Sequence, residues 1–339
     1  MSKSVLLVGS IPLASAEDVF RAVAQHVGPA VKRVPDGETG ERSGWTVWQD
    51  QVMAKSPDIE RSGSRDLHGI AYPTYAPKPG VEPERMEFGE LGYAKTAKDS
   101  YLVFSRLRSE GINSQARFQV SLPTPLAVVQ AFFWGSAALP HIWKAYERQL
   151  LKELDEIARF IPARDLSIQW DIAVEFHRIW EKPESELARQ FPTDKLIEAI
   201  ARISDHVPTD IELGWHFCYG DAGHKHFVEP HDTTIMADIA NRLIAATRRR
   251  LDWLHLPVPR ERDDVAYFTG LAKMKLHKMT ELYLGLIHLT DGLAGTKRRM
   301  AAADKVVFNY GIATECGFGR RVPETIPALL ELHRAAAEI

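Results

Sequence analysis

Short apolar runs recur along the chain, and most are separated by longer segments in which apolar residues follow a helical period. The runs predict eight strands, at Val5–Gly9, Ala30–Val34, Ala116–Leu122, Leu166–Asp171, Ile211–Phe217, Leu251–Leu256, Leu282–His288 and Val306–Ala313. The segments between and after them predict helices at His141–Phe160, Asp194–Asp205, Thr234–Arg250, Gly295–Asp304 and Pro323–Ile339. Strands alternating with helices in this way are typical of an α/β fold, and eight of them predict one (β/α)8 TIM barrel that spans residues 1–339.

The connection after the second predicted strand is too long for a single helix. Residues 57–100 contain five prolines, several glycines and three tyrosines. Long connections inside compact domains are usually functional lids or disordered linkers, and the aromatic content argues against disorder. We therefore expect an insertion at 57–100 that covers the mouth of the barrel.

Reactive and charged side chains gather where the predicted strands end. They are Ser10, Asp36, Glu38, Asp171, His216, Cys218, His288, Asp291 and Cys316. Active sites of α/β barrels form on the loops at the carboxyl ends of the strands. Unrelated polar residues would fall at both ends of the barrel, so this pattern predicts one shared site.

Three of these residues predict a metal site. His216 and Cys218 are two residues apart on one strand, so both side chains point to the same face and can bind one ion. Cys316 follows the last strand and can reach the same ion across the mouth of a closed barrel. Two sulfurs and an imidazole favour zinc, although a buried cysteine is more often an inert apolar residue.

Composition narrows the class of protein. The 339 residues are 45% hydrophobic and 26% charged, and the net charge is −3, so no broad basic surface for nucleic acid is expected. No apolar run approaches the length of about 20 residues that spans a membrane. The stretch Met1–Gly9 is too short for a secretion signal, and only two cysteines occur, so we expect a reducing cytoplasmic setting in which metal binding or catalysis is favoured over a disulfide.

The motifs together resemble the C-terminal barrel of cobalamin-independent methionine synthase and its superfamily, over most of the chain. The matching segments are Val8-Gly9-Ser10-Ile11-Pro12, Gly37-Glu38 with Glu41-Arg42, Ile168-Gln169-Trp170-Asp171, Gly214-Trp215-His216-Phe217-Cys218-Tyr219, Ile287-His288 and Thr314-Glu315-Cys316-Gly317. The resemblance implies zinc bound by the histidine and both cysteines, and a thiol substrate held by Ser10, Glu38 and Asp171. It also implies His288 as a general acid, which Asp291 could orient.

The sequence departs from this family at several positions. Where the family adds a glutamate zinc ligand, this chain reads Leu254-His255-Leu256-Pro257, so the fourth ligand stays open among His255, Glu229, water, substrate and three histidines, His224, His226 and His231. Ile172-Ala173 replaces the Glu-Pro pair that follows the aspartate in methionine synthases. Ala131 replaces the tryptophan that stacks on folate, and the separate N-terminal barrel has no counterpart, so methylfolate is not expected as the donor.

Three functions are consistent with these residues. The first is a zinc-dependent methyl or alkyl transferase that activates a small-molecule thiol toward an alkyl donor. The second is a hydrolase or lyase on the same barrel in which zinc activates water. The third dispenses with the metal and makes the chain a barrel of the related decarboxylase type or a ligand-binding protein. Trp45, Trp48, Phe132, Phe133 and Trp134 could line an aromatic pocket, although their spacing favours packing in the core.

Overall fold

The computed structural model describes residues 2–67, 70–220 and 227–339, and its centre is a parallel sheet of seven strands. The strands are β1 (Arg33–Pro35), β4 (Arg117–Pro123), β5 (Leu166–Ile172), β6 (Glu212–Phe217), β7 (Trp253–Pro257), β8 (Glu281–Ile287) and β9 (Gly311–Thr314). Their order in the sheet is their order in the chain, and each neighbouring pair is parallel. All seven overlap predicted strands, although β1 and β9 begin three and five residues later than predicted.

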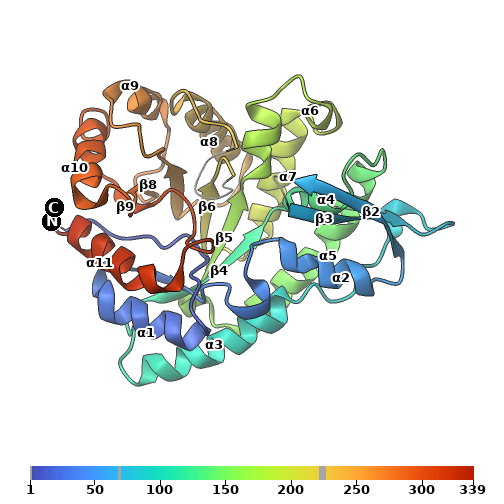
Figure 1. The fold of residues 1–339 in the computed structure, drawn as a ribbon, viewed down its shortest axis with the longest axis horizontal. Coiled ribbons are helices and arrows are strands. Elements are labelled where there is room, and N and C mark those ends of the chain that lie inside the picture. Colours follow the sequence, from blue (N-terminus) through green and yellow to red (C-terminus); the bar gives the residue numbers. More distant parts are fainter. Residues whose placement is uncertain (1, 68–69, 221–226) are drawn as a thin grey trace.

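Helices surround this sheet (Figure 1), and the two termini lie side by side. The helices are α1 (Ala16–His26), α2 (Asp50–Lys55), α3 (Tyr93–Ser109), α4 (Pro125–Phe132), α5 (Leu139–Phe160), α6 (Glu186–Gln190), α7 (Thr193–His206), α8 (Thr234–Ala246), α9 (Val265–Phe268), α10 (Gly292–Ala303) and α11 (Ile326–Ala337). The long ones are amphipathic, and their apolar faces pack on the sheet in one large core. The predicted helices correspond to α5, α7, α8, α10 and α11.

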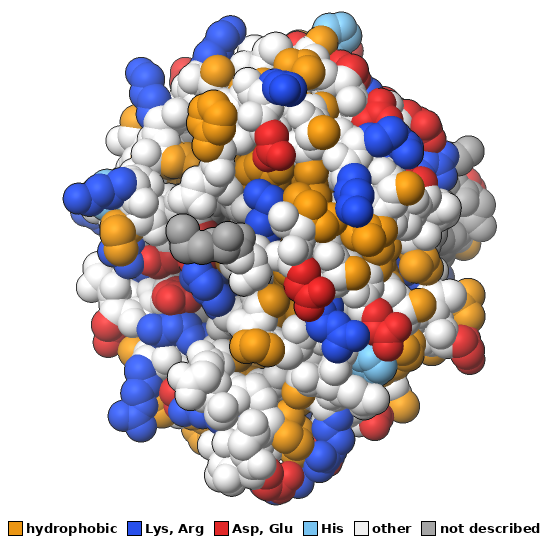
Figure 2. Space-filling model, turned by 90° about the vertical axis from the view of Figure 1, so that its left-hand side faces the viewer, with side chains coloured by type: hydrophobic (Ala, Val, Ile, Leu, Met, Phe, Trp, Pro, Cys, Tyr) orange, Lys and Arg blue, Asp and Glu red, His pale blue; other side chains and the backbone are white. Residues whose placement is uncertain are grey.

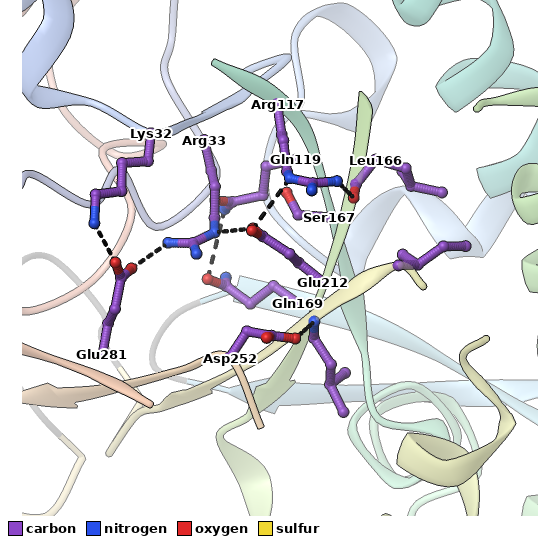
Figure 3. A network of polar contacts seen from close by, with 12 residues as sticks. Lys32, Arg33, Arg117, Gln119, Leu166, Ser167, Gln169, Glu212, Asp252 and Glu281 are labelled. Atoms are coloured by element: carbon purple, nitrogen blue, oxygen red, sulfur yellow. Dashed lines mark hydrogen bonds and ion pairs between the residues drawn. The ribbon is translucent and has the colours of Figure 1, made fainter. Parts of the chain in front are cut away.

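The sheet is strongly curled, as the contacts of Arg33 show. This buried side chain on the edge strand β1 donates to Glu212 of β6 at 2.6 Å and to Glu281 of β8 at 2.8 Å. Strands that are not neighbours therefore meet in the interior, where the ion pairs form a network at the amino ends of the strands (Figure 3). The Arg33 guanidinium also lies over the ring of Trp253, 4.3 Å from its centre.

The predicted first strand, Val5–Gly9, does not form a regular strand. Val5 makes isolated parallel bridges with Val31 and with Ile312, so the segment lies between the two ends of the sheet. Part of its hydrogen bonding goes to side chains, because the Gln169 amide donates to the Val8 carbonyl at 2.6 Å and the Gln119 amide to the same carbonyl at 3.1 Å. These side-chain donors supplement the backbone bonds from Val5 to Ala30 and from Leu6 to Ile312.

Residues 57–100 contain a second, two-stranded sheet. β2 (Ile59–Leu67) and β3 (Ile70–Pro77) pair antiparallel, and Tyr75 packs edge-on against Phe132 of α4, with ring centres 6.2 Å apart. The Tyr75 hydroxyl also donates to Asp50 at 2.5 Å. From Tyr93 onward the chain is already in α3, so the excursion ends before the last residues of the predicted insertion.

The surface is mixed in charge. On the face drawn in Figure 2, basic and acidic side chains alternate, and no large area of a single sign is present. Within the described ranges, no helix has both the length and the apolar character required to cross a membrane.

Candidate metal centre and pocket

The three predicted metal ligands converge at the carboxyl ends of β6 and β9. His216 is the penultimate residue of β6, and Cys218 follows the strand, with its backbone N–H bound to the Ile172 carbonyl at 3.1 Å. Cys316 lies two residues beyond β9 in a turn that packs on Ser10. Gly317 permits this approach, because a Cβ there would lie 3.1 Å from the Ser10 nitrogen.

The distances among these side chains fit a zinc ion. The ligand atoms of His216, Cys218 and Cys316 all lie within 4.8 Å of one another, and the two sulfurs are 3.7 Å apart. Zinc–sulfur bonds of about 2.3 Å in a tetrahedron place two sulfurs about 3.8 Å apart. Cys218 and Cys316 are not joined in a disulfide, and two sulfurs with one nitrogen form a donor set that zinc prefers.

A second histidine fixes the orientation of the first. Nδ1 of His216 lies 2.7 Å from Nδ1 of His255, and Nε2 of His255 lies 3.0 Å from the Thr314 carbonyl oxygen. Burial lowers the pKa of His216 well below its usual range and that of His255 to about 3, so both rings are neutral. The carbonyl only accepts, so Nε2 of His255 carries its hydrogen, His216 donates from Nδ1, and Nε2 of His216 is left to bind metal.

The contacts of the other candidate residues show which of them can serve as a fourth ligand. His255 is not one of them, because both of its nitrogens have partners. His231 is 98% exposed and pairs with Asp232, and Glu229 is exposed outside the cluster. His224 and His226 lie outside the described residues. Within the described ranges, no fourth histidine, cysteine or carboxylate joins the three.

The polar residues predicted to bind substrate lie beside this cluster. Asp171 of β5 is paired in register with His216 of β6, so both project from neighbouring strands on the same face. The Ser10 hydroxyl donates to Glu38, whose backbone has a positive φ of 51°. Ser10, Glu38 and Asp171 all line one pocket together with the three candidate ligands.

The two carboxyl groups are both poor acids in this setting. Burial, together with the nearby charge of Glu38, raises the pKa of Asp171 well above its usual range, against hydrogen bonds from Gln169 and Trp45. Burial also raises the pKa of Glu38, while the bond from Ser10 lowers it. The proximity of two carboxyls away from water favours a proton on one of them, which makes it a hydrogen-bond donor.

The pocket has a volume of about 650 Å³, enough for a small-molecule substrate. Its wall combines these polar residues with apolar ones and with side chains of the two-stranded sheet, namely Arg65 and Tyr72. Arg178 of the π-helix η6 (Phe176–Trp180) and Trp45 complete other parts of the wall. The pocket thus joins the strand ends to the excursion at 57–100.

His288 and Asp291 do not line this pocket. His288 is buried, with Nε2 2.9 Å from the Val258 carbonyl and Nδ1 3.7 Å from Glu315, and burial lowers its pKa. Asp291 binds both terminal nitrogens of Arg299, at 2.7 and 2.9 Å. The roles of general acid and orienting carboxylate remain predictions, and Glu315 is the carboxylate that lies within reach of the His288 ring.

Several residues of the pocket and of the metal centre are not identified from the sequence. Arg65 and Arg178 stand in segments without a recognisable motif, and the sequence suggests His255 only as a possible ligand. Of the aromatic residues considered for a pocket, Trp45 lines it, whereas Phe132 and Phe133 are buried in the core.

Comparison of the sequence with protein-family models and with curated proteins gives no match. Among solved structures, the chain is similar to a B12-independent methionine synthase from Shewanella sp. W3-18-1 in complex with selenomethionine, with a TM-score of 0.64 and 14% identity over 100% of this chain and 97% of that one. It is also similar to a methyltransferase from Methanosarcina mazei, with a TM-score of 0.57 and 12% identity over 99% and 94% of the two chains. At these identities the likeness defines the fold, whose solved relatives include methyltransferase-type enzymes.

Proposed function

We propose that this chain is a zinc-dependent methyl or alkyl transferase that acts on a small-molecule thiol. The observation that carries the proposal is the convergence of His216, Cys218 and Cys316, with a spacing that suits tetrahedral zinc, in the wall of a substrate-sized pocket. When bound there, zinc would hold the substrate sulfur as a thiolate, which is the nucleophile that takes the alkyl group. The fold shared with a methionine synthase and a methyltransferase supports the same chemistry.

Other residues of the chain would bind the substrate, position the metal ligand and supply a proton. Ser10, Glu38 and Asp171 bind polar groups of the substrate beside its sulfur, and the raised pKa values of both carboxyls suit a pair that shares a proton or accepts from an ammonium group. His255 keeps His216 in the tautomer that binds metal. His288, with Glu315 or Asp291 near it, is proposed as the proton donor to the leaving group. Because its ring does not line the pocket, this role requires a rearrangement of the pocket wall.

We also propose the finer architecture that this function requires. The segment from Val5 to Gly9 acts as the eighth element of a (β/α)8 barrel, because its bridges reach both ends of the sheet. The excursion at 57–100 acts as a lid, because Arg65 and Tyr72 from it line the pocket. The cytoplasm is the expected compartment, since there the two thiols remain reduced.

Dependence on a thiol tests the proposed function. Purified protein is incubated with a panel of alkyl donors, with and without added thiols, and alkylated products are measured by mass spectrometry. Transfer predicts product only when a thiol is present, and loss of product in the Cys316→Ser variant. Turnover without a thiol would favour the hydrolase or lyase in which zinc activates water, and no zinc-dependent turnover with any donor would contradict both.

A further inference from the structure

Arg65, Arg178 and Arg320 line the pocket, and the first two lie together on one tryptophan ring. Arg65 comes from β2 and Arg178 from η6, and both line the pocket. The carbon at the centre of each guanidinium lies 4.5 Å from the centre of the Trp134 ring. Two cations thus share one indole. Trp134 is 44% exposed, so the pair lies near solvent rather than at the floor of the pocket.

Within the described residues, neither guanidinium charge is neutralised by a carboxylate. In the part of the chain that the structure describes, no carboxylate pairs with Arg65 or Arg178, and Nε and Nη2 of Arg65 are buried without a hydrogen-bond partner. Arg299, in contrast, is fully buried and bound by both oxygens of Asp291. Burial and the charge of Arg178 lower the pKa of Arg65 to about 10, which leaves it protonated at neutral pH.

Placing two like charges together, partly shielded from water, costs free energy that an anion between them would recover. Guanidinium groups present planar pairs of donors that match carboxylate, sulfonate and phosphate oxygens. The acidic residues of the pocket are accounted for elsewhere, because Glu38 accepts from Ser10 and Asp171 accepts from Gln169. The anion that would stabilise the two guanidinium groups therefore has to come from the ligand.

We propose that Arg65 and Arg178 bind an anionic group of the substrate, so that the substrate is an acidic thiol with its sulfur inward and its anion at the pocket mouth. The inward placement of the sulfur rests on the proposed function, whereas binding of the anion by the two arginines does not require the metal. The arginines act as specificity-determining residues that reject neutral thiols.

The test compares acidic and neutral thiols of equal length. Titration calorimetry with the full chain measures binding of ω-mercaptoalkanoates of three to six carbons and of the matching mercaptoalcohols. At the best chain length, we expect the acid to bind at least about tenfold more tightly, as charge-assisted hydrogen bonds predict. Arg65→Gln and Arg178→Gln should each remove most of this preference and leave the alcohol unaffected. The matched control is Arg61→Gln, an exposed arginine on the same strand.

Equal binding of acid and alcohol at every length, or an undiminished preference in the double variant, would overturn the proposal. Mercaptoalkanesulfonates run in parallel distinguish the anionic groups, and a preference for either acid over the alcohol supports the inference. Arg65→Lys keeps the charge and should keep part of the preference, which separates loss of charge from loss of folding. Circular dichroism verifies that each variant is folded.

A separate arm distinguishes this proposal from the metal site. Alkanoates without a thiol are titrated into the Cys316→Ser variant, and their binding should still depend on Arg65 and Arg178. Thiols that bind without any preference for an acid would refute the anion site and leave the metal proposal standing. Anion binding that depends on the arginines, with no advantage for thiols over plain alkanoates in the unmodified chain, would refute the metal proposal and leave the anion site standing.

Discussion

Replacement of His255 tests whether this histidine positions a metal ligand rather than binding metal itself. In His255→Leu, the buried Nδ1–H of His216 loses its acceptor and the Thr314 carbonyl loses its donor. The His216 ring is then free to rotate or to change tautomer. Loss of such a partner typically lowers metal affinity by 10- to 100-fold, which corresponds to about 1.4 to 2.7 kcal/mol.

Asparagine at the same position provides the matched comparison. In His255→Asn, the side-chain oxygen can take the place of Nδ1 and accept from His216, so we expect zinc affinity within about threefold of the unmodified chain. Affinity is measured by competition with a colorimetric zinc chelator at pH 7.5, and thermal melting of the metal-free proteins measures the structural cost separately. Equal zinc affinity in the Leu variant and the unmodified chain would refute the reasoning, and loss of all zinc in both variants would indicate a direct ligand.

Three further predictions concern the fold that holds the site. Arg33→Met should lower the free energy of unfolding by about 2 to 3 kcal/mol, because it leaves two carboxylates short of their buried partner; a loss below about 1 kcal/mol in urea titrations would contradict this. Gly214→Ala places a Cβ 1.8 Å from the ring of Trp253, so we expect about 3 kcal/mol of destabilisation, and an unchanged melting temperature would disprove the close packing. Burial raises the pKa of Glu175 to about 7 from an ordinary 4.5, so the native state retains a proton that the unfolded state loses. Stability should therefore fall by up to about 3 kcal/mol as pH rises from 4.5 to 7. Glu38 and Asp171, whose pKa values are also raised, contribute a fall of the same sign. Glu175→Gln should therefore make the fall smaller by up to about 3 kcal/mol, and an equal fall in the variant would exclude Glu175 as a source.

The metal cluster could be predicted from the sequence because its geometry is mostly local. Two residues separated by one on a strand share a face whatever surrounds them, and this places His216 beside Cys218. To predict that Cys316 joins them, one must also assume that the strand ends converge, as they do in a barrel. Strand periodicity similarly located seven strands, since their apolar runs are buried on the sheet.

The other features of the site and of the sheet depend on contacts between segments far apart in the sequence, which no local pattern encodes. The role of His255 follows from the register of β6 and β7, which pairs His216 with His255. Arg65 and Arg178 meet on Trp134 because the β2–β3 pair packs on α4, the helix that ends just before Trp134, and their sequence neighbours give no sign of it. The apolar run at Val5–Gly9 predicts a strand, yet glutamines from β4 and β5 supply part of its hydrogen bonds.

The central claim, a zinc ion held by His216, Cys218 and Cys316, is tested most directly by the zinc content of protein purified without chelator. Mass spectrometry of the metal should find about one zinc per chain in the unmodified protein and in His231→Ala, an exposed histidine outside the cluster. Cys218→Ser and Cys316→Ser should each retain less than about a tenth of this amount while remaining folded by circular dichroism. Less than about half an equivalent in the unmodified protein, or full retention in the two cysteine variants, would contradict the account.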